Sequence, residues 1–272
     1  MPTGSSYLKK RRTALKFLTR TPKRKFGQRQ FHQLRVEIKK LRATLIRLEF
    51  QLKNFDGKRI YKPFRKLFAQ AGKVREIQIE KAMLHEQEEQ GQLPEYLKQL
   101  DKKIRKERSR FFNVRNVKLN SKIQKRLKSL EKKNRDAENL DPAPFLNSLT
   151  DEIKLLLLTG SLAPEGVHLL RKKLKNLTYN LESLPQQKLI QAHPDQDHLV
   201  NLLGTWHDLI TVHQTLLTEI TSEKISQEEK PILEKINDKF KSESDRIFDE
   251  INQKIPLFDD FVFFPKPKSQ EN

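Results

Sequence analysis

Apolar residues return every three or four positions along most of this chain, which is the period of an amphipathic α-helix. The alternation with a period of two that marks half-buried strands is not sustained anywhere, and glycine is scarce, with 8 in 272 residues. The sequence therefore predicts an all-α protein. Proline, glycine and polar stretches divide the pattern into helices at about residues 7–19, 28–53, 62–90 (with Pro63 in its first turn), 95–135, 143–158, 165–184, 197–223 and 228–254.

One of these helices occurs twice. The segment Phe31–Arg42 returns in degraded form as Val167–Thr178, and the matched positions lie 136 residues apart, which is half of the 272 residues. The two copies share an apolar stripe that suits a buried helix face. Its members are Leu34, Ile38 and Leu41 in the first copy and Leu170, Leu174 and Leu177 in the second. We infer an internal duplication whose two halves fold as one body.

A second stripe of each copy is cationic, lying roughly 120° away from the apolar stripe at 100° per residue. It starts with a histidine that an arginine follows by three residues. The members are His32, Arg35, Lys39 and Arg42 in the first copy and His168, Arg171 and Lys175 in the second. Solvated helix faces usually mix Glu with Lys at i,i+4, but the first stripe has only Glu37 and Glu49 nearby. This pattern favours contact with an anion.

The repeat extends to the next helix of each half, where a glycine precedes a base-acid pair. These elements are Gly72–Glu76, with Arg75 as the base, and Gly204–Asp208, with His207 as the base. We expect a basic N-terminal segment with a short helix at 1–26, a first helical-bundle repeat at 7–137, a linker at 138–141, a second repeat at 142–254 and a tail at 255–272. The tail contains the run Phe261–Phe264, whose aromatic rings we expect to pack on a bundle.

The chain is strongly basic, with a formal net charge of +20 at pH 7. Residues 1–136 contain 40 Lys and Arg against 13 Asp and Glu, a net charge of +27, whereas residues 137–272 contain 15 against 22, a net charge of −7. Such a field steers polyanions to the first half of the chain. Charge alone leaves nucleic acid, an anionic membrane and inorganic polyphosphate open as partners.

Several motifs and residue types are missing from the sequence. It has no cysteine, which removes disulfides and thiolate chemistry and fits a reducing compartment. Its longest apolar runs, such as Leu155–Leu158, fall far short of the roughly 20 residues that span a bilayer. It also lacks a phosphate-binding loop, a nucleophile elbow and a metal-binding His or Asp motif. We therefore expect a cytoplasmic protein that is not an enzyme, holds no metal or cofactor and contacts no membrane.

The duplicated residues resemble the signature of the CHAD domain family, which is named for histidines on α-helices. Residues 32–42 match its first form, His-x-x-Arg-x-x-x-Lys/Arg-Lys/Arg-x-Arg. His168–Lys172, with Lys175, Leu177 and Tyr179, matches its second form, and each copy is followed by a Gly-x-x-x-Asp/Glu helix, as in the family. The resemblance runs from about Lys9 to about Lys254, and it departs at Asn176 and Thr178, where the second form has basic residues.

This resemblance implies two pseudo-symmetric antiparallel four-helix bundles with a basic groove between them, and it implies non-catalytic binding of inorganic polyphosphate, with sulfate or phosphate as mimics. It also makes polyphosphate granules or the nucleoid the expected location within the cytoplasm. The ligand-binding residues that it implies are His32, Arg35, Lys39, Arg42, Arg75, His168, Arg171, Lys172, Lys175, Tyr179 and His207.

The main alternative is a nucleic-acid-binding module that uses the basic helix at 95–135 without reading the bases. Single-strand readers interleave aromatic rings with cations, but after Tyr96 at the start of this helix only Phe111 and Phe112 are available there. Two other interpretations stay open at this stage: the basic stripes as ordinary solvated faces, and His32 and His168 as buried structural residues. The sequence determines neither the oligomeric state nor any protein partner.

Overall fold

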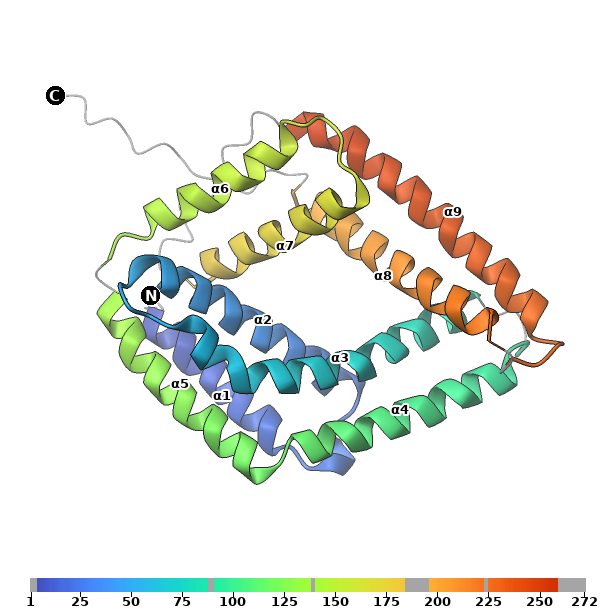
Figure 1. The fold of residues 1–272 in the computed structure, drawn as a ribbon, viewed down its shortest axis with the longest axis horizontal. Coiled ribbons are helices and arrows are strands. Elements are labelled where there is room, and N and C mark those ends of the chain that lie inside the picture. Colours follow the sequence, from blue (N-terminus) through green and yellow to red (C-terminus); the bar gives the residue numbers. More distant parts are fainter. Residues whose placement is uncertain (1–3, 88–90, 138–139, 184–195, 223–224, 259–272) are drawn as a thin grey trace.

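The computed structural model in Figure 1 describes residues 4–87, 91–137, 140–183, 196–222 and 225–258. In these ranges the chain forms nine α-helices and two short 3₁₀ segments, and no strand, so the predicted all-α class is confirmed. Within the same ranges, no helix combines the length and the apolar character that crossing a bilayer requires.

Four helices form the inner sides of a four-cornered ring (Figure 1). Neighbours around this ring are in contact, since α2 packs on α3 and α7, and α8 packs on α3 and α7. The four helices are α2 (Gln28–Gln51), α3 (Gly57–Gln87), α7 (Pro164–Leu181) and α8 (Gln196–Ile220). The two duplicated helices, α2 and α7, are therefore direct neighbours, and each is followed along the chain by the other inner helix of its own half.

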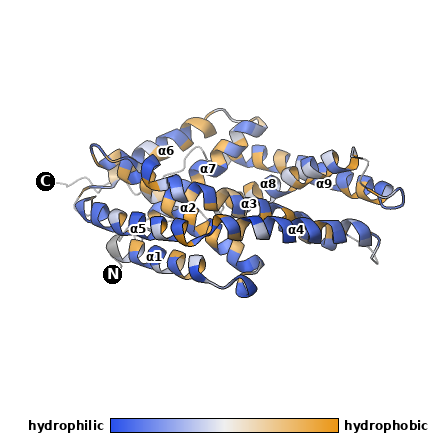
Figure 2. Cartoon of the chain, turned by 60° about the horizontal axis from the view of Figure 1, so that its bottom comes forward, coloured by the Kyte–Doolittle hydropathy of each residue, from blue (hydrophilic) through white to orange (hydrophobic). Residues whose placement is uncertain are grey.

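The remaining helices lie outside this ring, with α1 packed against α2 and α5 (Figure 1). Hydrophilic and hydrophobic residues lie on opposite sides of most helices, as the amphipathic pattern predicts (Figure 2). These outer elements are α1 (Gly4–Arg20), η1 (Lys23–Lys25), α4 (Pro94–Val114), α5 (Val117–Ala137), α6 (Ala143–Leu157), α9 (Lys230–Lys254) and η3 (Ile255–Phe258). The predicted packing of Phe261–Phe264 lies outside the described residues.

Two hydrophobic cores hold the fold together. The first joins α1, α2, α5 and the first part of α3, and its rings Phe26, Phe31 and Phe111 are fully buried, with centroids 4.8 to 5.3 Å apart. The second joins α6 to α9 with the far end of the α3–α4 hairpin, which contributes Leu84 and Tyr96. The buried leucines of both duplicated stripes lie in these cores, as predicted.

The α3–α4 hairpin is anchored in the second core by polar contacts as well. The hydroxyl of Tyr96 donates to Glu80 at 2.6 Å, and the carboxylate of Glu229 accepts the backbone N–H groups of Glu95 and Tyr96 at 2.7 and 2.9 Å. This carboxylate satisfies donors that the start of a helix leaves free. An element of the first half therefore completes the core of the second half, and the finer prediction of two four-helix bundles is not confirmed.

Two predicted helix boundaries are wrong. The basic helix expected at 95–135 is two helices, α4 and α5, because the side chain of Asn116 accepts the N–H of Leu119 at 2.9 Å and starts a new helix. Arg115, just before this break, donates to the carbonyls of Leu18 and Thr21 at 3.0 and 2.8 Å, which ties the turn to the end of α1.

Helix α3 begins at Gly57, so Pro63 lies inside the helix and not in its first turn. Asp56 accepts the N–H of Arg59 at 2.8 Å, and Asn54 adopts a left-handed conformation with φ of 61°. The short turn between α2 and α3 therefore both ends one helix and starts the next. The sequence pattern had indicated only the end of the first helix at this place.

Candidate functional site

The contact between the duplicated helices brings their cationic stripes together from opposite halves of the chain. Lys39 of α2 lies within electrostatic range of Arg171 and Lys175 of α7, which lower its pKa. Five partly buried cations from three helices make up this central cluster: Arg35, Lys39, Arg75, Arg171 and Lys175.

Lys39 is the most perturbed member of the central cluster. Burial, followed by the positive charges of Arg35, Arg171 and Lys175, lowers the pKa of Lys39 to about 8. The charge of Asp208 opposes this shift but does not cancel it. The free protein therefore holds its ammonium in a place where the charged form is disfavoured.

Carboxylates are scarce around the central cluster. None of its five cations forms an ion pair within 4 Å in the part of the chain that the structure describes. Asp208 of α8 is the acid that recurs, because its charge opposes the lowering of the pKa of Lys39, Arg75, Arg171 and Lys175. Burial outweighs these cations and raises the pKa of Asp208 itself. The sequence analysis named Asp208 only as the acid of the second base-acid element and did not count it among the ligand-binding residues.

Arg35 is positioned by α3. Its Nη1 donates to the carbonyl of Phe68 at 3.2 Å, and its guanidinium lies 4.3 Å from the centroid of the Phe68 ring. A methyl group on Gly72 would overlap Nη1 of Arg35. This close approach explains the glycine of the first base-acid element, and the charge of Glu76 partly offsets the lowering of the pKa of Arg35 by burial.

The second half of the site contains polar atoms that lack a partner. Nε of Arg171 and Nδ1 of His207 are buried and have no hydrogen-bond partner among the described residues. The ring of His168 lies 5.1 Å from that of His207 and 4.8 Å from that of Trp206. Buried polar groups are normally satisfied, and both atoms are able to donate a hydrogen bond to an acceptor.

The three predicted histidines carry lowered pKa values in the free protein. Burial, followed by Arg171 and His168, lowers the pKa of His207 to about 4. The pKa of His32 is lowered by desolvation and then by Arg75 and Lys39, although much of its side chain is exposed. For His168 the causes are burial, Lys172 and Arg171, in that order. All three are therefore neutral near pH 7 before a ligand binds.

Three predicted site residues lie at the margins of the central cluster. Arg42 is exposed and lies 5.7 Å from the ring of Tyr61, a residue that the sequence analysis missed. Lys172 is exposed and close enough to lower the pKa of His168 and His207. The ring of Tyr179 faces Lys40, whose Nζ is 5.6 Å from the centroid and also pairs with Glu182.

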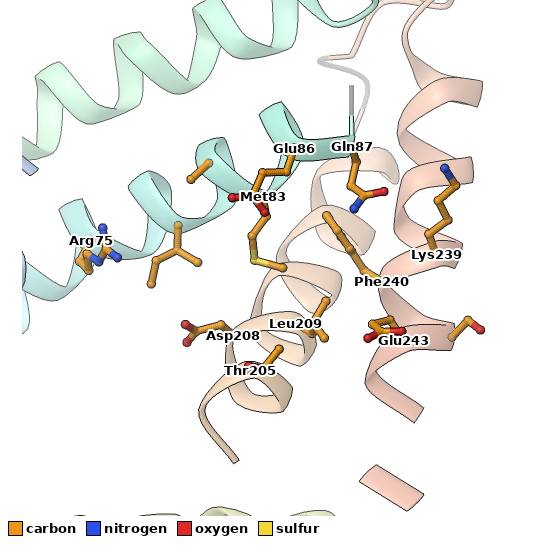
Figure 3. A pocket seen from close by; sticks show the side chains of 13 residues that line it. Arg75, Met83, Glu86, Gln87, Thr205, Asp208, Leu209, Lys239, Phe240 and Glu243 are labelled. Carbon is orange, nitrogen blue, oxygen red and sulfur yellow. The ribbon is translucent and has the colours of Figure 1, made fainter. Parts of the chain in front are cut away.

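A cleft of about 690 Å³ opens beside the central cluster between α3, α8 and α9. Figure 3 shows Arg75 and Asp208 at its inner side, with Met83 and Leu209 along its wall. Further out the cleft carries both signs of charge, with Lys239 and the acids Glu86 and Glu243. On this side, the central cluster is therefore bordered by a cleft whose lining mixes cations and carboxylates.

Taken together, these residues define an all-helical domain in which the cationic stripes of two helices meet. The family model of the CHAD domain matches residues 16–217, and the chain belongs to this family.

Comparison with curated proteins gives no match. Among solved structures, the chain is similar to the crystal structure of the CHAD domain from the plant Ricinus communis, with a TM-score of 0.66 and 14% identity over 93% of this chain and 87% of that chain. It is also similar to PptA from Streptomyces chartreusis, with a TM-score of 0.68 and 13% identity over 93% of this chain and 100% of that chain. At these identities the two likenesses establish the shared fold.

Proposed function

We propose that this protein binds inorganic polyphosphate at the central cluster without hydrolysing it. The observation that carries the proposal is the convergence of Arg35, Lys39, Arg75, Arg171 and Lys175, from both halves of the chain, with no ion-paired carboxylate among the described residues. Such a group of partly buried cations is unfavourable alone and becomes favourable around a polyanion.

The chemistry of the side chains fits a chain that carries about one negative charge per phosphate. Guanidinium groups can grip two oxygens at once, and a desolvated ammonium makes strong charge-assisted hydrogen bonds. A phosphate oxygen near Arg171 and His207 would also satisfy the buried Nε and Nδ1 atoms, with the neutral imidazole donating its proton from Nδ1. His32, His168, Lys172, Arg42 and Tyr179 extend the proposed site at its margins.

The proposal of binding without turnover rests on the acids of the site. Hydrolysis of a phosphoanhydride by the common metal-assisted route needs carboxylates that hold a divalent ion. Here Asp208 is the acid that acts on most of the central cluster, and it is surrounded by cations that compete with a metal. We therefore propose that the site holds no cofactor. We also propose a binding role at cytoplasmic polyphosphate deposits.

Nucleic acid is the main alternative ligand, and the placement of the aromatic residues on the predicted basic helix does not favour it. Phe111 is fully buried in the first core, and Phe112 is covered by the guanidinium of Arg115 at 4.6 Å. The rings on the predicted basic helix are therefore occupied within the fold and offer no platform on which bases could stack.

The test is a titration of the protein with polyphosphate of defined length beside RNA and duplex DNA of matched charge, in at least about 150 mM salt. We expect polyphosphate to bind at least about tenfold more tightly, or about 1.4 kcal/mol. Orthophosphate release in the same samples measures hydrolysis, and none is expected. Equal affinity for all three polymers would show nonspecific attraction and contradict the proposal.

A further inference from the structure

A second basic cleft lies outside the central cluster, between the first turns of α3 and the helix α5. Its volume is about 630 Å³. Among the described residues, its lining consists of six cations and two uncharged residues, with no carboxylate. We call these six cations the outer cleft: Arg59, Lys62 and Lys66 of α3 with Lys122, Lys125 and Arg126 of α5. The other two lining residues are Pro63 and Leu119.

The charges of the outer cleft are not neutralised by the protein. None of its six cations pairs with a carboxylate within the described ranges of the chain. Lys62 and Lys66, like Lys122 and Arg126, are four residues apart on one helix, a spacing at which like charges destabilise the helix. An anion held between α3 and α5 would remove this repulsion on both walls at once.

A band of exposed cations connects the outer cleft with the central cluster. Arg42, at the margin of the central cluster, lies beside Tyr61 of α3. At 100° per residue around α3, Arg65 is about 40° from Tyr61, Lys62 about 100° and Lys66 about 140°. All three cations are exposed. For a helix about 10–12 Å across, this arc is only about 15 Å long, so one extended polyanion can contact both sites.

The composition of the outer cleft favours a bare phosphate chain over a nucleic acid. In the part of the chain that the structure describes, its lining contains no aromatic side chain on which a base could stack and no amide or carboxylate side chain that could read a base edge. The cleft offers only point charges and guanidinium forks, which match phosphate oxygens.

We propose that the outer cleft is a second subsite for inorganic polyphosphate, and that it holds a distal part of the same chain whose other part occupies the central cluster. This inference rests on the proposed function. Two linked subsites make affinity depend on chain length, because the second contact is intramolecular and has a high effective concentration. A chain too short to reach both subsites gains nothing from this effect.

The test compares tripolyphosphate, which fits one subsite, with a polyphosphate of about 100 units in the full-length protein. The variant Lys62→Glu with Lys122→Glu reverses one charge on each wall of the outer cleft. Its matched control is Lys98→Glu with Lys235→Glu, which makes the same change of net charge at two exposed positions on α4 and α9. The milder variant Lys62→Gln with Lys122→Gln replaces the first variant if circular dichroism shows that its helices are lost.

We expect the outer-cleft variant to lose at least about tenfold in affinity for the long chain, to keep its affinity for tripolyphosphate, and to differ from the control, which should lose less than about threefold. Equal losses in the two variants would overturn the subsite, because only net charge would then matter. Loss of duplex DNA binding with unchanged binding of the long chain would also overturn it and assign the cleft to nucleic acid. If the wild-type protein does not bind tripolyphosphate at its central cluster, the proposed function fails, whichever result the outer cleft gives.

Discussion

The guanidinium of Arg35 occupies the space that a side chain at position 72 would need. Arg35 comes from the first duplicated helix, and Gly72 comes from the base-acid element that follows it, so the two repeated elements of the first half meet in one contact. Gly204, the matching glycine of the second half, has nothing within 4 Å of the place where a Cβ would be. The two glycines are therefore equivalent in sequence and different in packing.

The first prediction follows from this difference. Gly72→Ala should displace the flexible end of Arg35 and weaken polyphosphate binding by about three- to tenfold, because Arg35 loses the contact with Phe68 that orients it. Gly204→Ala is the control and should leave binding unchanged while stabilising the protein by about 0.5–1 kcal/mol, since alanine favours a helix. Isothermal titration and thermal unfolding measure both quantities, and equal binding losses in the two variants would show that Arg35 does not touch the ligand.

A second prediction concerns the asymmetry between the two stripes. Arg35→Glu with Lys39→Glu should weaken binding more than Arg171→Glu with Lys175→Glu, because Asn176 and Thr178 leave the second stripe with fewer cations around it. Both variants should keep their helices, because substitutions off the apolar face usually change stability little. Loss of helix in circular dichroism would make these residues structural and the assignment wrong.

The third prediction uses the pKa of Lys39, which is about 8 in the free protein. A bound polyanion favours the ammonium, so binding raises this pKa and takes up a proton above pH 8. The contribution of Lys39 to affinity should therefore be constant below about pH 7 and fall as the pH rises from about 8 towards 9.5. Lys39→Arg keeps a charge in this window and should flatten the profile; a profile that keeps its slope would remove Lys39 from the site.

A rise in pH affects the stability of the free protein in the opposite way, again through Lys39. The folded-state pKa of about 8 lies below the ordinary lysine value of 10.5, so the unfolded chain binds more protons between these two pH values. The contribution of Lys39 to stability therefore increases as the pH rises from about 8 to about 10.5. Denaturant unfolding of the wild-type protein and of Lys39→Arg across this range measures the difference.

The histidines give a fourth prediction at lower pH. Because His32 and His168 have lowered pKa values in the free protein, they gain charge only below their ordinary value of about 6.5. Phosphate favours the imidazolium, so affinity should increase as the pH falls from about 6.5 to 5. The double variant His32→Gln with His168→Gln should lose this increase and keep most of the affinity at pH 7.5. An unchanged increase would exclude both histidines from the site.

A fifth prediction tests Asp208. Removing its negative charge with Asp208→Asn should strengthen polyphosphate binding by about fivefold, or about 1 kcal/mol, because the ligand no longer meets a like charge among the cations. Glu243→Gln, in the outer part of the neighbouring cleft, is the control and should change affinity less. Weaker binding by Asp208→Asn would show that this carboxylate orients the cations for the ligand.

Much of this arrangement could be predicted from the sequence. Periodicity alone predicts the all-α class and most helix positions, since each helix must bury one stripe. The repeat identified the cationic stripes, because the same helical spacing of a histidine and cations occurs in both copies. The division into a 7–137 and a 142–254 repeat remains a prediction.

Tertiary structure decided the rest, because contacts between distant segments do not leave a periodic signal. The break at Arg115–Asn116 depends on carbonyls at the end of α1, and the cores are joined by a hairpin whose Tyr96 meets Glu229. The pKa of Lys39 is lowered first by burial and then by cations that include Arg171 and Lys175 of α7, a helix that the chain reaches more than a hundred residues later. The sequence by itself determined which residues are cationic and which face of each helix is apolar. Only the packing of α2 against α7 brought those cations close enough for Arg171 and Lys175 to act on the pKa of Lys39, because their charges repel its ammonium.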